Sequence, residues 1–137
     1  MTSESFSRQN VGDVMFAGLA MPPVVVTLAW PDKVLSPNAR VHWSVKSKAT
    51  KAARTAAFYL TRAVASIKPT WKGARLNITF NPPSRRRYDR DNLVMRLKAS
   101  QDGISDALGI DDSLFIPTYE MGDPVKGGAV RVEIRPL

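Results

Sequence analysis

Half of the acidic residues of this chain fall in one stretch, residues 89–112. The sequence has 12 Asp and Glu residues in all. The six in this stretch are all aspartates: Asp89, Asp91, Asp102, Asp106, Asp111 and Asp112. Four arginines lie beside them: Arg85, Arg86, Arg87 and Arg90. Mg²⁺ prefers oxygen ligands, and between carboxylates and a phosphodiester it can activate water and stabilise the leaving oxygen. Arginines bind the flanking phosphates, which carboxylates alone would repel. The pattern favours a metal-dependent site for phosphodiester chemistry.

The spacing of these residues supports that interpretation. Asp89 and Asp91 are two positions apart, so they point to the same side of an extended segment. They lead into a predicted helix, whose first amide groups favour negative charge. Along that helix, Asp91, Lys98 and Asp102 lie within about 40° of one another. A different face carries the apolar side chains Leu93, Leu97, Ile104 and Leu108. One face is therefore expected to be buried while the other carries acid, lysine and acid.

The chain can bring a further carboxylate to this face after the helix ends. Gly109 is well placed to terminate the helix, and Asp111 and Asp112 follow it directly. Structural alternatives remain open for each acid. Asp91 could cap the helix, Lys98 and Asp102 could form an ordinary surface pair, and Asp111 and Asp112 could be turn residues. The arginines could simply solvate a loop.

Composition narrows the classes of protein that fit. The chain has 137 residues, enough for one domain, and a formal net charge of +8, which favours polyanion partners. It has no cysteine, which excludes disulfide scaffolds, thiolate metal sites and cysteine nucleophiles. Its single histidine, His42, excludes a two-histidine metal motif. The N-terminus lacks the pattern of a signal peptide, and the apolar run at residues 24–30 is too short to span a bilayer. A cytoplasmic protein with no membrane partner is expected.

The elements that must position these residues can be outlined from local patterns. We predict a polar leader (residues 1–22), possibly flexible, and a single domain over residues 23–137. Strands are predicted at residues 24–30, 74–80 and 129–134. Helices are predicted at residues 44–66, with Ser44 as the cap, and at residues 91–108. A short extended segment lies within residues 110–120 and is interrupted by Pro117. This order indicates an α+β fold: a small mixed sheet with two main helices packed on one face.

The first predicted helix combines an apolar face with many cations. The apolar positions keep 3–4 spacing: Val45, Ala49, Ala52, Ala56, Tyr59, Leu60 and Ala63. The cations are Lys46, Lys48, Lys51, Arg54 and Arg62, and they fit either a solvated face or a phosphate-facing surface. Trp43, just before this helix, is expected to pack in the core, with base stacking as the alternative.

Two segments of the chain resemble the RusA family of Holliday-junction resolvases, small endodeoxyribonucleases often encoded by phages and prophages. One is residues 85–93 (RRRYDRDNL) and the other is residues 106–112 (DALGIDD). Residues 26–31 (VTLAWP), 36–38 (SPN) and 124–128 (PVKGG) are similar to further parts of the family. The resemblance implies a RusA-like α+β fold, a homodimer, dependence on Mg²⁺, for which Mn²⁺ can substitute, and paired symmetric nicks across a four-way DNA junction.

The resemblance also implies roles for individual residues. Asp89 and Asp91 correspond to the first two catalytic, metal-binding carboxylates, and Asp112 to the third, with Asp111 beside it. The catalytic lysine of the family lies four residues after the second aspartate, where this chain has Met95. Lys98 lies seven residues after Asp91, and an insertion of three residues, nearly one helical turn, would give it the role of the lysine. Arg96 is the other candidate cation, and the remaining alternative is that neither replaces the lysine.

The remaining expected roles concern DNA and the surroundings of the acids. Asp102 and Asn92 are expected to support the site from beside it. The expected phosphate-binding residues are Arg85, Arg86, Arg87, Arg90, Lys46, Lys48, Lys51 and Lys126. We expect water to attack the phosphodiester while Lys98 steadies the developing charge. Two other functions remain open: a non-catalytic nucleic-acid-binding protein whose aspartates are caps and turns, and a nuclease for other branched DNA.

Overall fold

The structure is a computed structural model that describes residues 23–65 and 68–137. The predicted leader, residues 1–22, lies outside the described residues, as does the predicted C-terminal end of the first helix. The elements follow one another as β1 (Val24–Ala29), η1 (Lys33–Leu35), α1 (Trp43–Val64), β2 (Ala74–Asn81), α2 (Arg90–Arg96), α3 (Lys98–Leu108), η2 (Asp112–Leu114), β3 (Phe115–Met121) and β4 (Ala129–Pro136).

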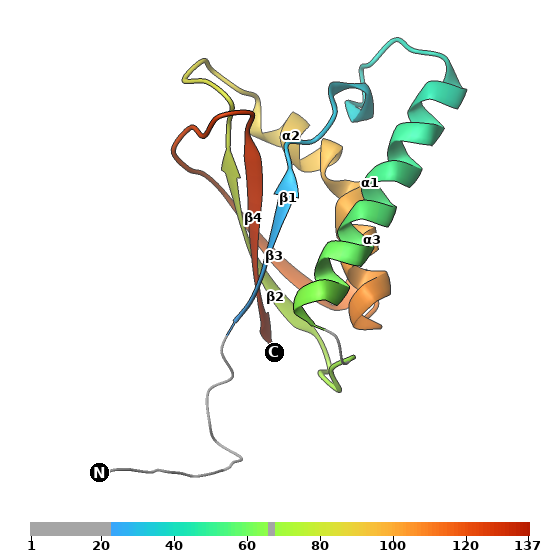
Figure 1. Cartoon of the computed structure of the whole chain (residues 1–137), viewed down its shortest axis with the longest axis vertical. Coiled ribbons are helices and arrows are strands. Elements are labelled where there is room, and N and C mark those ends of the chain that lie inside the picture. Colours follow the sequence, from blue (N-terminus) through green and yellow to red (C-terminus); the bar gives the residue numbers. More distant parts are fainter. Residues whose placement is uncertain (1–22, 66–67) are drawn as a thin grey trace.

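The four strands form one mixed sheet in the order β1-β4-β2-β3. β4 pairs antiparallel with both β1 and β2, whereas β2 and β3 run parallel. A parallel pair needs a long connection, and this one contains α2, α3 and η2. α1 and α3 lie side by side against one face of the sheet (Figure 1). The predicted α+β class and small mixed sheet are confirmed.

The core lies between this sheet and the helices. The alternation that predicted the strands at residues 74–80 and 129–134 is seen as alternating burial along β2 and β4. The helix side of the core comes from the four apolar residues expected on one face of the second helix. Each of these side chains is at most 1% exposed: Leu93, Leu97, Ile104 and Leu108. Burial of that apolar face is the main force that holds the crossover on the sheet.

The strand after the crossover runs through Pro117 and is not interrupted by it. β3 covers Phe115–Met121, and Pro117 lies opposite Leu76 in the parallel pairing with β2. Proline cannot donate a ladder hydrogen bond, but β3 is an edge strand, so one side of its backbone needs no partner in the sheet. Edge position is a tertiary property, which explains why the local sequence suggested a break.

The predicted helix at residues 91–108 is two helices that meet at Leu97. The Leu97 amide donates to both Leu93 and Val94 carbonyls, at 3.1 and 3.2 Å, which tightens the turn between α2 and α3. Both Leu93 and Leu97 are buried across this junction. α3 ends at Gly109, which takes the left-handed conformation (φ 70°) expected of a glycine that terminates a helix.

α1 buries a different face from the one predicted. Its fully buried residues are Ala57 and Thr61, whereas Val45, Tyr59 and Leu60 of the predicted apolar face are exposed. The reason is a close approach to α3 at Gly103, where an added Cβ would lie 2.2 Å from the Arg54 carbonyl oxygen. Small residues make that contact possible. The alanines of α1 span about 140° of the helix and include both predicted positions, such as Ala52 and Ala56, and the buried Ala57, so spacing alone did not identify the buried face.

The start of α1 also differs from the prediction. Trp43 is already helical, and the cap is His42, whose Nδ1 accepts from the Ser44 amide at 3.2 Å. Ser44 is therefore not the cap. The Trp43 side chain is 74% exposed, so the expectation that it packs in the core is wrong. None of the helices in the two described ranges has the length and apolarity needed to cross a bilayer.

Candidate functional site

The acids singled out in the sequence all lie in the connection between the parallel strands β2 and β3. Asp89 and Asp91 lie at the start of α2, after the arginine-rich loop that follows β2. Lys98 is the first residue of α3 and Asp102 lies one turn later. Asp112 begins η2, after the turn at Gly109. A single crossover therefore supplies the whole candidate site.

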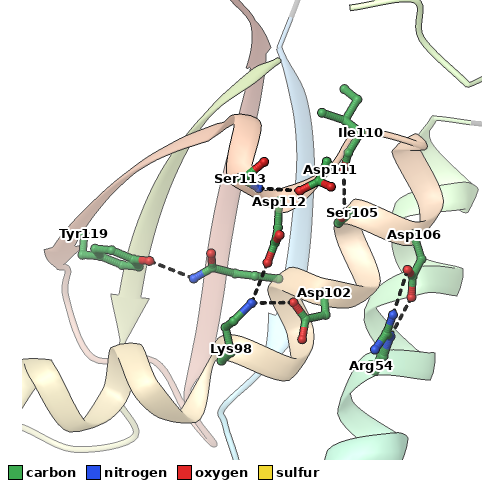
Figure 2. A network of polar contacts seen from close by, with 11 residues as sticks. Arg54, Lys98, Asp102, Ser105, Asp106, Ile110, Asp111, Asp112, Ser113 and Tyr119 are labelled. Carbon is green, nitrogen blue, oxygen red and sulfur yellow. Dashed lines mark hydrogen bonds and ion pairs between the residues drawn. The ribbon is translucent and has the colours of Figure 1, made fainter. Parts of the chain in front are cut away.

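Lys98 bridges two carboxylates in this crossover. Its Nζ donates to Asp102 Oδ1 at 2.7 Å and to Asp112 Oδ2 at 2.6 Å (Figure 2). These hydrogen bonds, with Asp102 first, raise the pKa of Lys98, so its ammonium stays charged at neutral pH. The shared helix face predicted for Lys98 and Asp102 is confirmed, and so is the return of Asp112 after the turn. We call Lys98, Asp102 and Asp112 the lysine cluster.

A second ion pair lies one helical turn beyond the lysine cluster. Arg54 of α1 binds Asp106 of α3 with two hydrogen bonds, Nε to Oδ2 at 2.7 Å and Nη2 to Oδ1 at 3.0 Å (Figure 2). The pair lowers the pKa of Asp106 and raises that of Arg54, and the charges of Asp102 and Asp112 also raise the pKa of Arg54. Arg54 is thus held at Asp106, one turn of α3 after Asp102 of the lysine cluster.

Sequence reasoning placed Arg54 among the cations of α1 but did not connect it with the acids. The two partners are 52 positions apart, so no local spacing relates them. One available signal was Asp106 itself, which follows Asp102 by one turn and therefore lies on a neighbouring part of the same helix face.

Asp89 and Asp91 differ from the lysine cluster in their partners. Asp89 Oδ1 accepts from the Asn92 amide at 3.2 Å, so Asp89 caps α2, a role the sequence had offered to Asp91. Asp91 is exposed in the first turn. Among the described residues, no ion pair reaches either carboxylate, and no hydrogen bond joins them to Lys98 or Asp112.

Asp111 has a local structural role. Its Oδ1 accepts from the Ser113 amide at 2.9 Å, which caps η2. That hydrogen bond to the backbone lowers the pKa of Asp111. Asp111 is therefore a turn residue, one of the alternatives that the sequence left open. Its neighbour Asp112 contacts Lys98 instead.

The carboxylate oxygens of the candidate site are of the type that Mg²⁺ prefers, but they do not form a group of three ligands. Carboxylate oxygens at Asp89 and Asp91 are hard ligands, and Mg²⁺ in phosphoryl-transfer sites is often held by one or two carboxylates plus water and substrate phosphate. Within residues 23–65 and 68–137, no three Asp, Glu, His or Cys side chains form a group that could hold an ion. Two carboxylates at the start of α2 are thus the better-suited pair.

Lys98 and Arg96, the two candidates for the catalytic lysine of the RusA family, have different contacts in the structure. Lys98 contacts Asp112, whereas Arg96 donates to the Pro31 carbonyl oxygen and burial lowers the pKa of Arg96. Met95, at the usual spacing of the lysine, is 57% exposed. Of the two cations, Lys98 is the one placed to act with an acid of the site.

The basic residues expected to bind DNA lie mainly on two exposed segments. The loop before α2 carries Arg85, Arg86 and Arg87, with Arg90 at the first turn of α2, and all four are exposed. The Arg86 guanidinium lies 4.8 Å from the centre of the Tyr88 ring. The other segment is α1, where Lys48 and Lys51 are exposed and Lys46 is partly buried; Lys126 is exposed in the turn before β4.

The loop after β1 links these two segments, a role that the sequence did not reveal. Lys46 Nζ donates to the Ser36 carbonyl oxygen at 2.9 Å, and Asn92 Nδ2 donates to Ser36 Oγ at 2.7 Å. Ser36 therefore fixes the start of α1 relative to the start of α2. Asn92 is held by this contact beside Asp91, in keeping with the supporting role expected for it.

Comparison with known proteins identifies a relative but no activity. A protein of Xylella fastidiosa (strain Temecula1 / ATCC 700964), described as an uncharacterized protein, is 44% identical to this chain over 109 residues. The match covers 74% of this chain and 68% of that protein. No family model matches the chain. Its function must therefore be inferred from its own residues.

Proposed function

This chain belongs to the same family as the Xylella fastidiosa protein, and we propose that it is a Mg²⁺-dependent endodeoxyribonuclease that cuts four-way DNA junctions. The observation that carries the proposal is the contact of Lys98 with Asp112, in the same crossover as Asp89 and Asp91. The resemblance to the RusA family named the aspartates together, with Lys98 as a candidate for the lysine that the family has where this chain has Met95. One crossover contributes all of these residues, next to four exposed arginines.

The proposed reaction is hydrolysis of a phosphodiester. A water oxygen bonds to phosphorus, the bond to the 3′ oxygen breaks, and the products carry 5′-phosphate and 3′-hydroxyl ends. Asp89 and Asp91 would hold Mg²⁺, which would supply an activated water and stabilise the leaving oxygen. Asp112, the third ligand in the RusA resemblance, is bound by Lys98 in this structure and would have to leave that contact to join them. Mn²⁺ is expected to substitute for it.

The other side chains bind and orient the substrate. Arg85, Arg86 and Arg87 hold phosphates that flank the scissile one, which offsets repulsion from the carboxylates. Lys98 donates a hydrogen bond to the oxygen on which charge develops. Asp102 keeps Lys98 protonated and directed toward Asp112.

A homodimer is part of the proposal. Two strands of a symmetric junction must be cut as a pair, and two copies related by a twofold axis present two equivalent sites. A cytoplasmic location, where branched DNA arises in a bacterial cell, also belongs to it.

A labelled four-way junction tests the proposal directly. Purified full-length protein is incubated with the junction in Mg²⁺, in Mn²⁺ and in EDTA. We expect paired, symmetric nicks in either metal and none in EDTA. Forks and flaps added as competitors separate a junction resolvase from a nuclease that prefers other branched DNA. Stable binding without nicking in both metals would contradict the proposal.

A non-catalytic DNA-binding protein is the second candidate. It is favoured by the structural roles of two aspartates, since Asp89 caps α2 and Asp111 caps η2. The free carboxylate of Asp91 and the bridging of Asp112 by Lys98 favour the nuclease, because neither is needed as a cap. The same nicking assay distinguishes the two candidates.

A further inference from the structure

Trp43 lies at the first turn of α1 with its ring in solvent. The side chain is 74% exposed, more than any other large apolar residue of the described chain. Its nearest aromatic neighbour is His42, with ring centres 5.5 Å apart and planes inclined by 35°. A tryptophan is usually largely buried, so a ring that is 74% exposed at a helix start calls for a functional explanation.

The surface beside Trp43 is hollow and basic. A depression of about 450 Å³ is lined by Trp43, Lys46, Ser47, Thr50, Lys51 and Arg54. These residues recur at helical spacing on one side of α1. The sequence of α1 contains no Asp or Glu. The hollow therefore combines one aromatic ring, hydroxyl groups and an excess of positive charge, which is the combination that binds unpaired nucleic acid.

The hollow adjoins the candidate nuclease site. Arg54 lines the hollow and also holds Asp106 of α3, one turn from Asp102 of the lysine cluster. Trp43 is 11 residues before Arg54, about 16 Å along the helix axis at 1.5 Å per residue. Successive phosphates of one DNA strand are about 3.4 Å apart along a duplex, so this span corresponds to about five nucleotides. A strand that passes Arg54 can thus reach Trp43.

We infer that this hollow receives an unstacked DNA base and that Trp43 stacks on it, which makes Trp43 a determinant of selectivity for branch points over continuous duplex. In a duplex, neighbouring bases cover both faces of each base, whereas a branch point can expose one. The positive charge of the hollow complements the phosphates on either side of that base. The inference rests on the proposed function, which supplies branched DNA as the ligand.

Equilibrium binding in EDTA tests this inference without cleavage. Trp43→Ala and Trp43→Phe are compared with the unchanged protein on a four-way junction and on a duplex of the same arm sequence. Tyr59→Ala is the matched control, because Tyr59 is an exposed aromatic of the same helix, 66% exposed, that does not line the hollow. Thermal unfolding of each variant confirms that it folds.

We expect a loss of affinity only for Trp43→Ala and only on the four-way junction. Stacking on an aromatic side chain contributes about 1–3 kcal/mol per base, so Trp43→Ala should weaken junction binding between about 5-fold and about 150-fold. Duplex binding should change less than about 2-fold, since no base face is free there. Trp43→Phe should keep most of the affinity. A 2-aminopurine base at the branch point should lose its fluorescence change in Trp43→Ala.

The outcomes separate this inference from the proposed function. Equal losses on junction and duplex, or no loss on either, overturn the role of Trp43 even if the unchanged protein nicks junctions. A selective loss on the junction supports the role of Trp43, even if Mg²⁺ never produces nicks and the nuclease proposal fails.

Discussion

Two parts of the crossover carry pairs of aspartates, one at α3 and η2 and the other at the start of α2. They differ in whether a cation of the chain pairs with the negative charge. At the start of α3 and in η2, Asp102 and Asp112 share the ammonium group of Lys98. At the start of α2, within the described residues, Asp89 and Asp91 have no ion-pair partner. The first part carries its own counter-charge, whereas no cation of the described residues forms an ion pair with the second. A divalent cation would act at the second part, and the lysine at the first.

The largest expected effect comes from the part without a counter-charge. Asp91→Asn should lower Mg²⁺-dependent nicking of a four-way junction by more than about 100-fold, because it removes a carboxylate that binds the ion. DNA binding should persist or strengthen, since a negative charge near phosphate is lost. Gel assays of cleavage and binding measure the two effects. Near-normal nicking by this variant would refute the assignment of Asp91.

Asp106→Asn is the matched control for that variant. It changes another exposed aspartate of the same crossover, but one whose carboxylate binds Arg54. Nicking by Asp106→Asn should stay within about 3-fold of the unchanged protein, because Asp106 is not among the residues proposed to hold Mg²⁺ or to contact the reacting phosphate, and exposed ion pairs contribute about 0–1 kcal/mol.

The next effect concerns the part that carries its own charge. Lys98→Met should reduce nicking by about 100-fold or somewhat less, the scale seen when one donor to a developing oxyanion is removed. Folding should be affected little, because the Lys98 side chain is 61% exposed and surface ion pairs contribute about 0–1 kcal/mol. Single-turnover cleavage and thermal unfolding separate the two effects. Unchanged cleavage would make Lys98 only a structural counter-ion for Asp102 and Asp112.

A smaller effect is expected from the arginines that precede α2. Substitution of Arg85, Arg86 and Arg87 together by Gln should make the salt dependence of DNA binding less steep. Each lost phosphate contact reduces the slope of log K against log salt by about 0.9, so the total change is up to about 2.7. Affinities measured across a salt series give the slope. If the slope does not change, these side chains only solvate the loop.

The smallest effect is a pH dependence of stability. The pKa of Asp106 is lowered by Arg54, so the ionised carboxylate stabilises the folded state above its unfolded pKa. That contribution is lost as the pH falls through the folded-state pKa. The difference in Tm between the unchanged protein and Asp106→Asn should therefore be present at neutral pH and disappear in acid. Melting curves between pH 7 and pH 3 test this. A difference that persists in acid would contradict the ionic origin.

Local patterns were sufficient for β1, β2 and β4 and for the pair of Lys98 with Asp102. Alternation at residues 74–80 and 129–134 corresponds directly to burial, because one face of each strand packs on the helices. Lys98 and Asp102 are one turn apart, so helical spacing alone predicted their contact. Gly109 ends α3 as expected, because its left-handed backbone conformation depends on the residue type and not on contacts with distant segments.

The remaining features depend on contacts between distant segments. The Arg54–Asp106 pair joins two helices, and the position of Pro117 on an edge strand follows from strand order. The buried face of α1 is chosen by its approach to Gly103, not by its own apolar spacing. Trp43 illustrates the same limit, because large apolar residues are usually buried and this one is not.

The close crossing of α1 and α3 at Gly103 leaves no room for a side chain at that position. A Cβ added there would lie 2.2 Å from the Arg54 carbonyl oxygen and 2.9 Å from Ala57 Cβ, so even a methyl group would push the two helices apart. The separation would change how Arg54 of α1 reaches Asp106 of α3, although neither of those side chains is altered.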